Sequence, residues 1–218
     1  MNMARQAAQG ASDVRIAVIG AGGHSKEVAD LIVACGHSLA GFQDDARNGA
    51  HSPTGAPIVG DVAEVEFDGL TIAIGEVATR RRVHDTLAHT DRLTTLVHPS
   101  ASISPYASIG DGTQVMQNVV VSADARVEEN VILNVGCFVA HDCVVGAHCH
   151  IAPGVLLSGG CSVGEASLCG AGAVVLPGVR IGADCTVGAG AVVIADVPDG
   201  ATVAGVAARV IEADADAE

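Results

Sequence analysis

The chain has 218 residues, of which 49% are apolar, and its mean hydropathy is +0.43. This is enough chain to bury one large core or two small ones. The formal net charge of −14 opposes binding to nucleic acid, whose partners need a basic face. No run approaches the ~20 apolar residues of a membrane span, and the first dozen residues lack the apolar run of a signal peptide, so we expect neither.

Residues 14–96 have the pattern of alternating strands and helices. Apolar runs at 14–19, 39–42 and 70–74 predict three buried strands. A helix that ends near Gly36 follows the first run, and an Arg-rich helix at about 80–82 follows the third. We predict a small parallel sheet, which binds ligands at the carboxyl ends of its strands.

Polar sequences follow the first two predicted strands. Gly20, Gly22, Gly23 and His24 follow the first, and Asp44 and Asp45 follow the second. Glycines before a helix let the backbone approach an anion at the helix N-terminus. Ser25 stands where the dinucleotide fingerprint has its third glycine, so we do not expect a nicotinamide dinucleotide. A sugar diphosphate and a merely structural turn both stay open.

From residue 97 to about 198, an apolar residue returns every six positions, from Val97 through Val145 to Val193. Four positions later comes a small or β-branched residue, and three positions later thirteen of the seventeen hexads carry Gly, Asn or Asp, which accept positive φ. This repeat predicts a parallel β-helix with three hexads per coil. The pattern alone does not fix the hand of the coil.

Six of the seven cysteines fall on inward positions of this repeat: Cys137, Cys143, Cys149, Cys161, Cys169 and Cys185. We expect them to be buried as free thiols rather than paired in disulfides or bound to metal. Reduced thiols suit a cytoplasmic protein.

Histidines gather in the coil at 133–150. The repeat puts His141 and Asp142 at an outward corner, where they form either a solvated turn or a general base oriented by a carboxylate. Gly159 comes three hexads after His141, so it stacks on it and its amide is a possible oxyanion donor. His150 lies half a coil away from His141. The two can therefore share a site only across a subunit boundary.

The other histidines indicate less. His37, His51, His84 and His89 lie in polar or helical surroundings, and we expect them to be solvated. A zinc site with His148 and His150 would need a third ligand on a facing coil, and the repeat has no further histidine outside 141–150 except His98 at its start. We therefore expect no metal.

Several stretches together resemble a known family: GAGGHSKEV at 20–28, DD at 44–45, IG at 74–75 with Arg80, HPSA at 98–101, HDCVVGAHCHIAPG at 141–154 and GVAARVI at 205–211. They resemble the nucleotide-sugar N-acetyltransferases of the left-handed β-helix superfamily. Enzymes that acetylate the 4-amino group of GDP-perosamine or of UDP-linked bacillosamine precursors look most similar. Glu76 departs from the family pattern, which commonly has a small polar amide there.

The resemblance implies a domain layout and an assembly. Residues 1–13 would be a disordered start, 14–96 an α/β domain that holds the nucleotide-linked amino sugar, 97–198 a left-handed β-helix that binds acetyl-CoA, and 199–218 a C-terminal tail. The family forms homotrimers with active sites between subunits. A cytoplasmic role in making lipopolysaccharide O-antigen follows from the same resemblance.

The resemblance also implies roles for individual residues. His141 would be the base and Asp142 its partner. Gly159 would offer its amide to the thioester oxygen, with His150 and Asn134 near the acetyl group. The nucleotide-sugar pocket would contain Gly22, Gly23, His24, Asp44 and Asp45.

The expected reaction is direct attack of a sugar amine on acetyl-CoA, without an acyl-enzyme, on a dideoxy amino sugar for which GDP-perosamine is the first candidate. Two alternatives stay open. One is O-acetylation of sialic acid or another sugar, and the other is a non-catalytic sugar-nucleotide sensor or scaffold.

Overall fold

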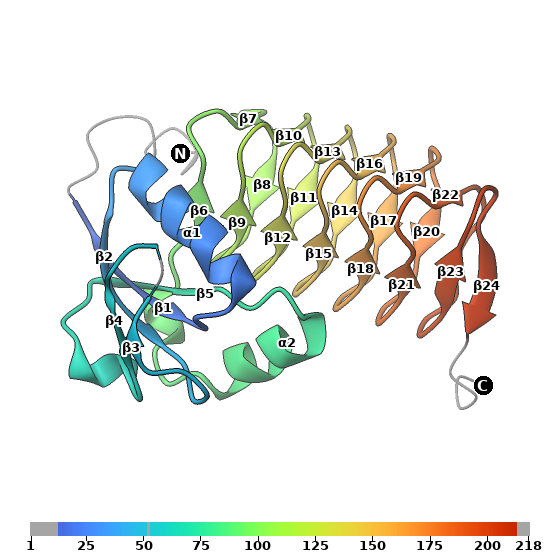
Figure 1. Ribbon diagram of the computed structural model, residues 1–218. Helices are drawn as coiled ribbons and strands as arrows, with labels where there is room; N and C mark the ends of the chain where they lie inside the picture. The colour runs from blue at the N-terminus through green and yellow to red at the C-terminus, as the bar shows by residue number, and fades with distance from the viewer. Residues whose placement is uncertain (1–12, 52, 213–218) are drawn as a thin grey trace.

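The N-terminal part of the chain is an α/β unit built on a five-stranded sheet. The computed structural model describes residues 13–51 and 53–212 (Figure 1). The elements of this unit are β1 (Arg15–Ile19), α1 (Gly23–Ala34), β2 (Ser38–Gln43), β3 (Gly49–Ala50), β4 (Pro57–Val59), the 3₁₀ turn η2 (Val62–Glu64), β5 (Gly69–Ile72), α2 (Val77–Thr86) and the 3₁₀ turn η3 (Thr90–Arg92). The strand order is β3-β4-β2-β1-β5, and only the β3–β4 pair is antiparallel.

The three predicted strands and both predicted helices of this unit are confirmed. The sequence does not predict the short hairpin of β3 and β4, because the glycine and proline content of 48–60 is typical of a loop. Neither α1 nor α2 has the length and apolar character that crossing a bilayer requires.

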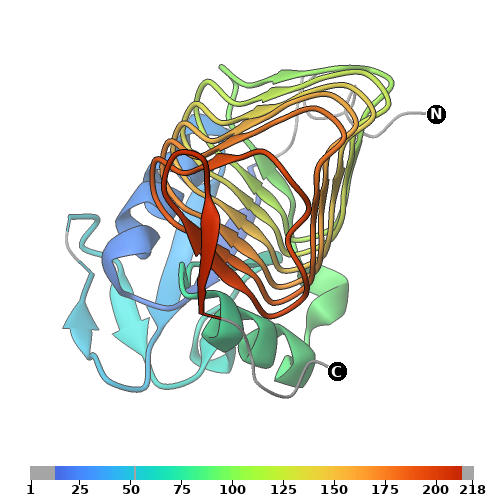
Figure 2. The same cartoon turned by 90° about the vertical axis from the view of Figure 1, so that its right-hand side faces the viewer.

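Residues from Leu96 onward wind into a left-handed parallel β-helix of triangular cross-section (Figure 2). Each coil contributes one short strand to each of three sheets, named here faces 1, 2 and 3. Face 1 contains β6 (Leu96–Val97), β9 (Gln114–Val115), β12 (Ile132–Leu133), β15 (His150–Ile151), β18 (Leu168–Cys169), β21 (Thr186–Val187), β23 (Thr202–Ala204) and β24 (Arg209–Glu212).

The other two faces continue the same ladder. Face 2 contains β7 (Ser102–Ile103), β10 (Val120–Val121), β13 (Phe138–Val139), β16 (Leu156–Leu157), β19 (Val174–Val175) and β22 (Val192–Val193). Face 3 contains β8 (Ser108–Ile109), β11 (Arg126–Val127), β14 (Val144–Val145), β17 (Ser162–Val163) and β20 (Arg180–Ile181).

The register of the β-helix is the one that the hexads predict. Strands three hexads apart pair directly, as Val121 does with Val139. At the corners, every sixth residue from Gly112 to Gly190 has positive φ, including His148 at 62°. The six cysteines of the repeat are buried and free, as expected. Stacked apolar side chains therefore fill the prism, and the corners are left to polar residues.

The C-terminal end differs from the expected tail. β23 and β24 extend face 1 beyond residue 198, and they pair with each other in antiparallel fashion. Residues 1–12 of the expected start and 213–218 of the expected tail lie outside the described residues.

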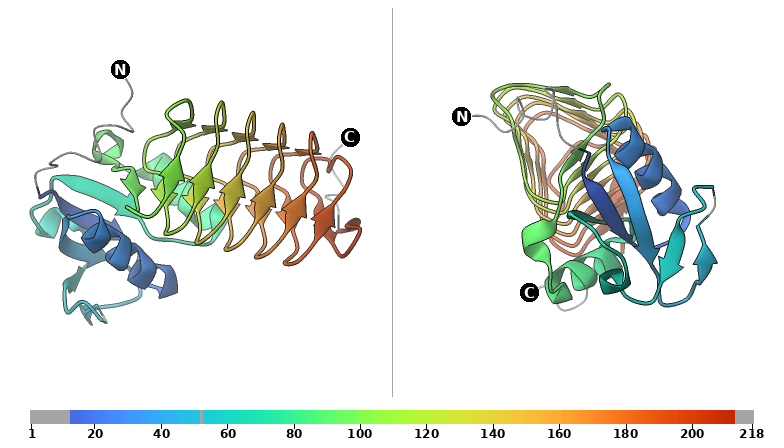
Figure 3. Two further views of the ribbon diagram at one scale, coloured as in Figure 1. Left: turned by 90° about the horizontal axis from the view of Figure 1, so that it is seen from above. Right: turned by 90° about the vertical axis from the view of Figure 1, so that its left-hand side faces the viewer.

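The α/β unit lies beside the N-terminal coils, against face 1 (Figure 3). The side-chain amide of Gln114 on β9 donates to Thr71 Oγ1 at 2.8 Å and to the Ile72 carbonyl at 2.9 Å. The Cys35 thiol at the end of α1 donates to the Val97 carbonyl at 3.2 Å. These contacts place the carboxyl ends of β1 and β5 next to the outer side of face 1.

Candidate active site

His141 and Asp142 lie at the corner between faces 2 and 3, after β13. Their side chains are 69% and 64% exposed. His141 Nδ1 lies 2.7 Å from Asp142 Oδ2, and because a carboxylate only accepts, Nδ1 carries the hydrogen. The lone pair of a neutral ring is then on Nε2. The pair can therefore take up a proton at Nε2 while Asp142 holds the ring in place.

Gly159 lies under the His141 ring, one coil further on. A Cβ added to Gly159 would come 2.6 Å from both Cε1 and Nε2 of His141, so a side chain there would displace the ring. The next amide, from Gly160, donates to the His141 carbonyl at 2.9 Å. The Gly159 amide donates to no acceptor in the described chain. It is therefore available to a ligand oxygen beside Nε2.

His150 lies on the outer side of face 1, in a second cluster. Its Nδ1 lies 2.9 Å from the Gly75 carbonyl, at the end of β5. Its Nε2 lies 3.3 Å from Asn134 Nδ2, and Asn134 Oδ1 accepts from the Val135 amide at 2.7 Å. Burial lowers the pKa of His150 to about 4, which the bond to Gly75 only partly offsets. His150 is therefore neutral at pH 7.

His24 joins this second cluster from the first turn of α1. Its Nε2 lies 2.9 Å from Gln114 Oε1, and its ring centroid lies 6.3 Å from that of His150. Its Nδ1 faces Glu27 at 3.2 Å. His24 therefore points from the glycine loop toward face 1 of the β-helix.

The structure divides the predicted site residues into two groups within one chain. One group is His141, Asp142 and Gly159, and the other is His24, Asn134 and His150 with the nearby Gly22 and Gly23. The first group lies at the corner between faces 2 and 3, whereas the second lies on face 1 and the adjoining corner between faces 1 and 2. Within the described residues of one chain, the two groups therefore lie apart.

Asp44 mainly organises the glycine loop. Its carboxylate accepts from the amides of Ala21 at 2.9 Å and Ala46 at 3.0 Å and pairs with Arg47 at 3.1 Å. Burial favours the neutral acid, but these hydrogen bonds and Arg47 outweigh it and lower the pKa of Asp44. Asp45, by contrast, is exposed. Of the two predicted carboxylates, Asp45 is the one left open to solvent.

A cavity of about 410 Å³ lies at this end of the sheet. Its lining includes two cations, Lys26 and Arg47, together with Ala21, Asn48, His51 and Ile58. Cationic and apolar groups at the carboxyl ends of parallel strands suit a phosphorylated ligand with an aromatic base.

His51 contradicts the expectation of a solvated histidine. His51 is only 3% exposed, its ring stacks on Phe42 with centroids 3.8 Å apart, and its Nε2 lies 2.8 Å from Ser25 Oγ. Burial and Lys26 lower its pKa. The prediction is wrong because the polar sequence around His51 is typical of a loop, whereas β2 and α1 bury the ring.

His84 is also less solvated than expected. Its side chain is 13% exposed, and its ring lies edge-on to His148, with centroids 4.9 Å apart. His84, Asp85 and His148 form a group whose potential ligand atoms lie within 4.8 Å of one another. Burial, then His84 and Arg81, lower the pKa of His148, against the opposing charges of Asp85 and Glu129. Arg80 donates to the His148 carbonyl, so two arginines lie beside the group and oppose a bound cation.

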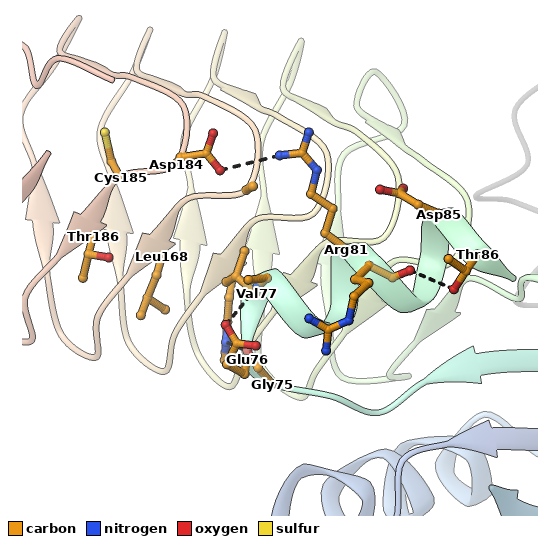
Figure 4. A pocket seen from close by; sticks show the side chains of 14 residues that line it. Gly75, Glu76, Val77, Arg81, Asp85, Thr86, Leu168, Asp184, Cys185 and Thr186 are labelled. Carbon is orange, nitrogen blue, oxygen red and sulfur yellow. Dashed lines mark hydrogen bonds and ion pairs between the residues drawn. The ribbon is translucent and has the colours of Figure 1, made fainter. Parts of the chain in front are cut away.

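A larger cavity, of about 760 Å³, begins at His150 and runs between α2 and face 1 (Figure 4). Its lining includes Glu76, Arg81 and Arg82 from the α2 side and Leu168, Asp184 and Thr186 from later coils. Arg81 is paired with Glu165 and Asp184. Glu76, the departure from the family pattern, caps α2 by accepting from the amides of Ala78 and Thr79. These bonds, with Thr79 foremost, lower the pKa of Glu76.

The comparisons with known proteins agree with this two-part architecture. Residues 15–87 match the PglD N-terminal domain family, and residues 124–159 and 160–195 match the bacterial transferase hexapeptide family. The chain is 38% identical over 109 residues to UDP-N-acetylbacillosamine N-acetyltransferase of Bacillus subtilis (strain 168), which is 46% of this chain and 50% of that protein. The match thus spans about half the length of this curated relative.

Two solved structures are similar over nearly the whole chain. The acetyltransferase domain of PglB from Neisseria gonorrhoeae FA1090, in complex with acetyl coenzyme A, has a TM-score of 0.85 and 39% identity, and the match covers 92% of this chain and 100% of that one. PerB from Caulobacter crescentus, in complex with CoA and GDP-perosamine, has a TM-score of 0.84 and 39% identity, with 91% and 97% covered.

The fold and these relatives identify an acetyltransferase of the left-handed β-helix type. The chain belongs to the hexapeptide-repeat acetyltransferases that carry a PglD-type N-terminal domain.

Proposed function

We propose that the protein transfers the acetyl group of acetyl-CoA to the 4-amino group of a nucleotide-linked dideoxy sugar, with GDP-perosamine as the first candidate. One observation carries the proposal: a carboxylate-oriented imidazole lies over a glycine with a free amide, in a chain similar along 91% of its length to a protein solved with CoA and GDP-perosamine. We place the reaction in the cytoplasm, and its product in the assembly of a polysaccharide such as O-antigen.

The proposed step is direct attack on the thioester. The amine nitrogen bonds to the carbonyl carbon, and the resulting oxyanion accepts a hydrogen bond from the Gly159 amide. His141 Nε2 takes the proton that the amine loses. The C–S bond then breaks, and this proton passes to the departing CoA sulfur, which leaves as the thiol. A positioned base typically contributes about 10²- to 10⁴-fold.

The site proposed here needs two copies of the chain, and face 2 is the surface that would join them. Its outer positions become apolar after the first coil: Ser102, Val120, Phe138, Leu156, Val174 and Val192. Phe138 and Leu156 are 36% and 41% exposed. The outer positions of face 3 include Ser108, Arg126, Ser162 and Arg180, so face 2 is the more apolar of the two.

Face 2 also lies between the two groups of site residues. His141 follows β13 at one edge of the face, and Asn134 follows β12 at the other edge. If three copies turn face 2 toward a common threefold axis, the His141 corner of each copy comes next to the Asn134 corner of its neighbour. A heterologous contact of this kind closes into a ring. The homotrimer therefore supplies a complete site at each of its three boundaries.

A charge introduced on face 2 tests the assembly. Leu156→Glu puts a carboxylate in the proposed interface. We expect sedimentation velocity to show monomers, and we expect these monomers to lack transferase activity. Val144→Glu is the matched control, because Val144 is 37% exposed on face 3. This variant should stay trimeric and active. A monomeric wild-type protein, or trimers in Leu156→Glu, would refute the proposed interface.

The two cavities suggest where the substrates bind. We propose that the 410 Å³ cavity with Lys26 and Arg47 holds the nucleotide diphosphate, and that the sugar extends past Gly22, Gly23 and His24 toward His150. The 760 Å³ cavity, which begins at His150, is the proposed path of CoA. The described chain shows no ion pair for Arg82, so this residue is the candidate phosphate partner there.

Release of free CoA tests the function. The protein is incubated with acetyl-CoA and a panel of GDP- and UDP-linked 4-amino sugars, and separately with sialic acid and other sugars without a free amine. Thiol release is followed together with the mass of the sugar. We expect acetylation of one of these amines. Release only with sialic acid or another sugar hydroxyl would indicate O-acetylation. Tight nucleotide binding with no release from any acceptor would indicate a sensor or scaffold.

A further inference from the structure

Arg80 of α2 is a buried cation that joins the α/β unit to the β-helix. Arg80 is 1% exposed, and no carboxylate of the described chain lies within ion-pair distance of it. Its guanidinium donates instead to five carbonyls, at 2.5–3.2 Å: Ile74, Gly75, Asn130, His148 and Cys149. Two of these belong to the loop after β5, and three belong to two successive coils.

The planar guanidinium suits this role. Its five N–H groups form a fixed fork, whereas a lysine ammonium has three donors at one point and cannot reach all five carbonyls. Burial lowers the pKa of Arg80 to about 10, so the group is still charged at neutral pH. Arg80 therefore ties the Gly75 loop to two coils of the β-helix through a single side chain.

Gly75 links Arg80 to the active-site histidine. Its carbonyl accepts from Arg80 Nη1 at 3.2 Å and from His150 Nδ1 at 2.9 Å. A carbonyl cannot donate, so Nδ1 of His150 must carry the hydrogen and the lone pair is on Nε2. This Nε2 accepts from Asn134 Nδ2, and the bond from the Val135 amide to Oδ1 fixes the orientation of the Asn134 amide.

We infer that Arg80 is a positioning residue, which holds the Gly75 carbonyl where it fixes the tautomer of His150 and so keeps the Nε2 lone pair toward the Asn134 amide. Arg80 itself contacts no substrate in this account. The inference assigns its effect to the proposed acetyl transfer and so rests on that function, but the tautomer can be measured without any substrate.

Long-range ¹H–¹⁵N correlation spectra of protein labelled with ¹⁵N-histidine test the tautomer directly. We expect His150 of the wild-type protein to have a protonated Nδ1 and a bare Nε2. In Arg80→Lys, the spectrum should show a mixture of tautomers. Arg15→Lys is the matched control, because in the described part of the chain the Arg15 side chain pairs only with the exposed Glu66, and it should keep the wild-type spectrum.

Kinetics give the second readout. We expect kcat of Arg80→Lys to fall at least about tenfold, because misplaced groups lose the benefit of orientation, with KM for the nucleotide sugar nearly unchanged. A hydrogen on Nε2 in the wild-type protein would overturn the inference even if Arg80→Lys did not fold. An unchanged tautomer and kcat in folded Arg80→Lys would overturn it as well. If the tautomer responds as expected but no acceptor is acetylated, the proposed function fails while the positioning role stands.

Discussion

His141 and His150 lie nine residues apart in one coil, yet their surroundings are opposite. His141 is 69% exposed and has one side-chain partner, Asp142, next to it in the sequence. His150 is largely buried, its pKa is lowered to about 4, and its partners Gly75 and Asn134 come from two different parts of the chain. One ring is free to exchange a proton, whereas the other is held neutral in one tautomer.

The difference shows how one scaffold can supply two kinds of histidine. A corner of the β-helix projects into solvent, so a ring there keeps an open nitrogen. A face covered by the α/β unit removes water, so a ring there must satisfy both nitrogens within the protein. We therefore expect substitutions at His141 to lower the rate of acetyl transfer. Substitutions at His150 should change both the arrangement of the site and the pH dependence of stability.

Replacing the exposed histidine should have the largest effect. We expect His141→Asn to lower kcat by about 10²-fold or more, because the base is lost, with a smaller change in KM. Steady-state thiol release measures both constants. His98→Asn serves as control, because within the described residues the His98 ring bonds only to Ser100. Unchanged activity of His141→Asn at neutral pH would exclude a role as base.

Displacing the same ring without removing it should cost less. Gly159→Ala places a methyl group 2.6 Å from the ring positions of His141, so the imidazole must move. We expect kcat to fall by about 10- to 100-fold, since a misplacement of the order of 1 Å can cost up to about 10². The melting temperature should stay close to that of the wild type, because Gly159 lies at a partly exposed corner. A fully active variant would contradict the proposed geometry.

Mixing two inactive variants tests whether the two histidines meet across a boundary. His141→Asn and His150→Gln are unfolded and refolded together, so that their trimers mix at random. A site that takes His141 from one copy and His150 from the next is then intact in about one case in four, so about a quarter of wild-type activity should return. No recovery in verified mixed trimers would mean that the site takes both histidines from the same copy.

The buried histidine should make stability depend on pH. The pKa of His150 is about 4 in the folded protein and 6.5 for an ordinary histidine, so the unfolded chain binds the proton first as pH falls. This contribution is fully present above about pH 6.5 and is lost as pH falls toward 4. Between pH 7 and pH 4.5 it amounts to about 2 to 3 kcal/mol per chain.

Urea unfolding at a fixed protein concentration measures this effect. We expect the free energy of unfolding of wild-type protein to decrease more between pH 7 and pH 4.5 than that of His150→Asn. Other titrating groups are common to both proteins and largely cancel in the comparison. Equal decreases in the two proteins would show that His150 is not held neutral.

The sequence predicts much of the fold and the half of the candidate site that contains His141. The half that contains His150 depends on contacts that follow no sequence period. The hexad repeat fixes which residues point inward, so it predicts the buried cysteines, the exposed corner of His141 and the stacking of Gly159. No such period connects Arg80 with Asn130, or His24 with Gln114, which are 50 and 90 residues apart. The polar sequence around His51 predicts a surface position, whereas packing against β2 and α1 buries the ring.

The amino-acid sequence by itself therefore determined the β-helix, its register and the His141–Asp142–Gly159 corner, because each coil closes after three hexads and stacks on the one before. The tertiary structure decided the neutral state of His150, the five carbonyl contacts of Arg80 and the hydrogen bond from the glycine loop to Asp44. Each of these depends on how elements distant in sequence pack together, and burial and carbonyl geometry then set the protonation state and the hydrogen bonds.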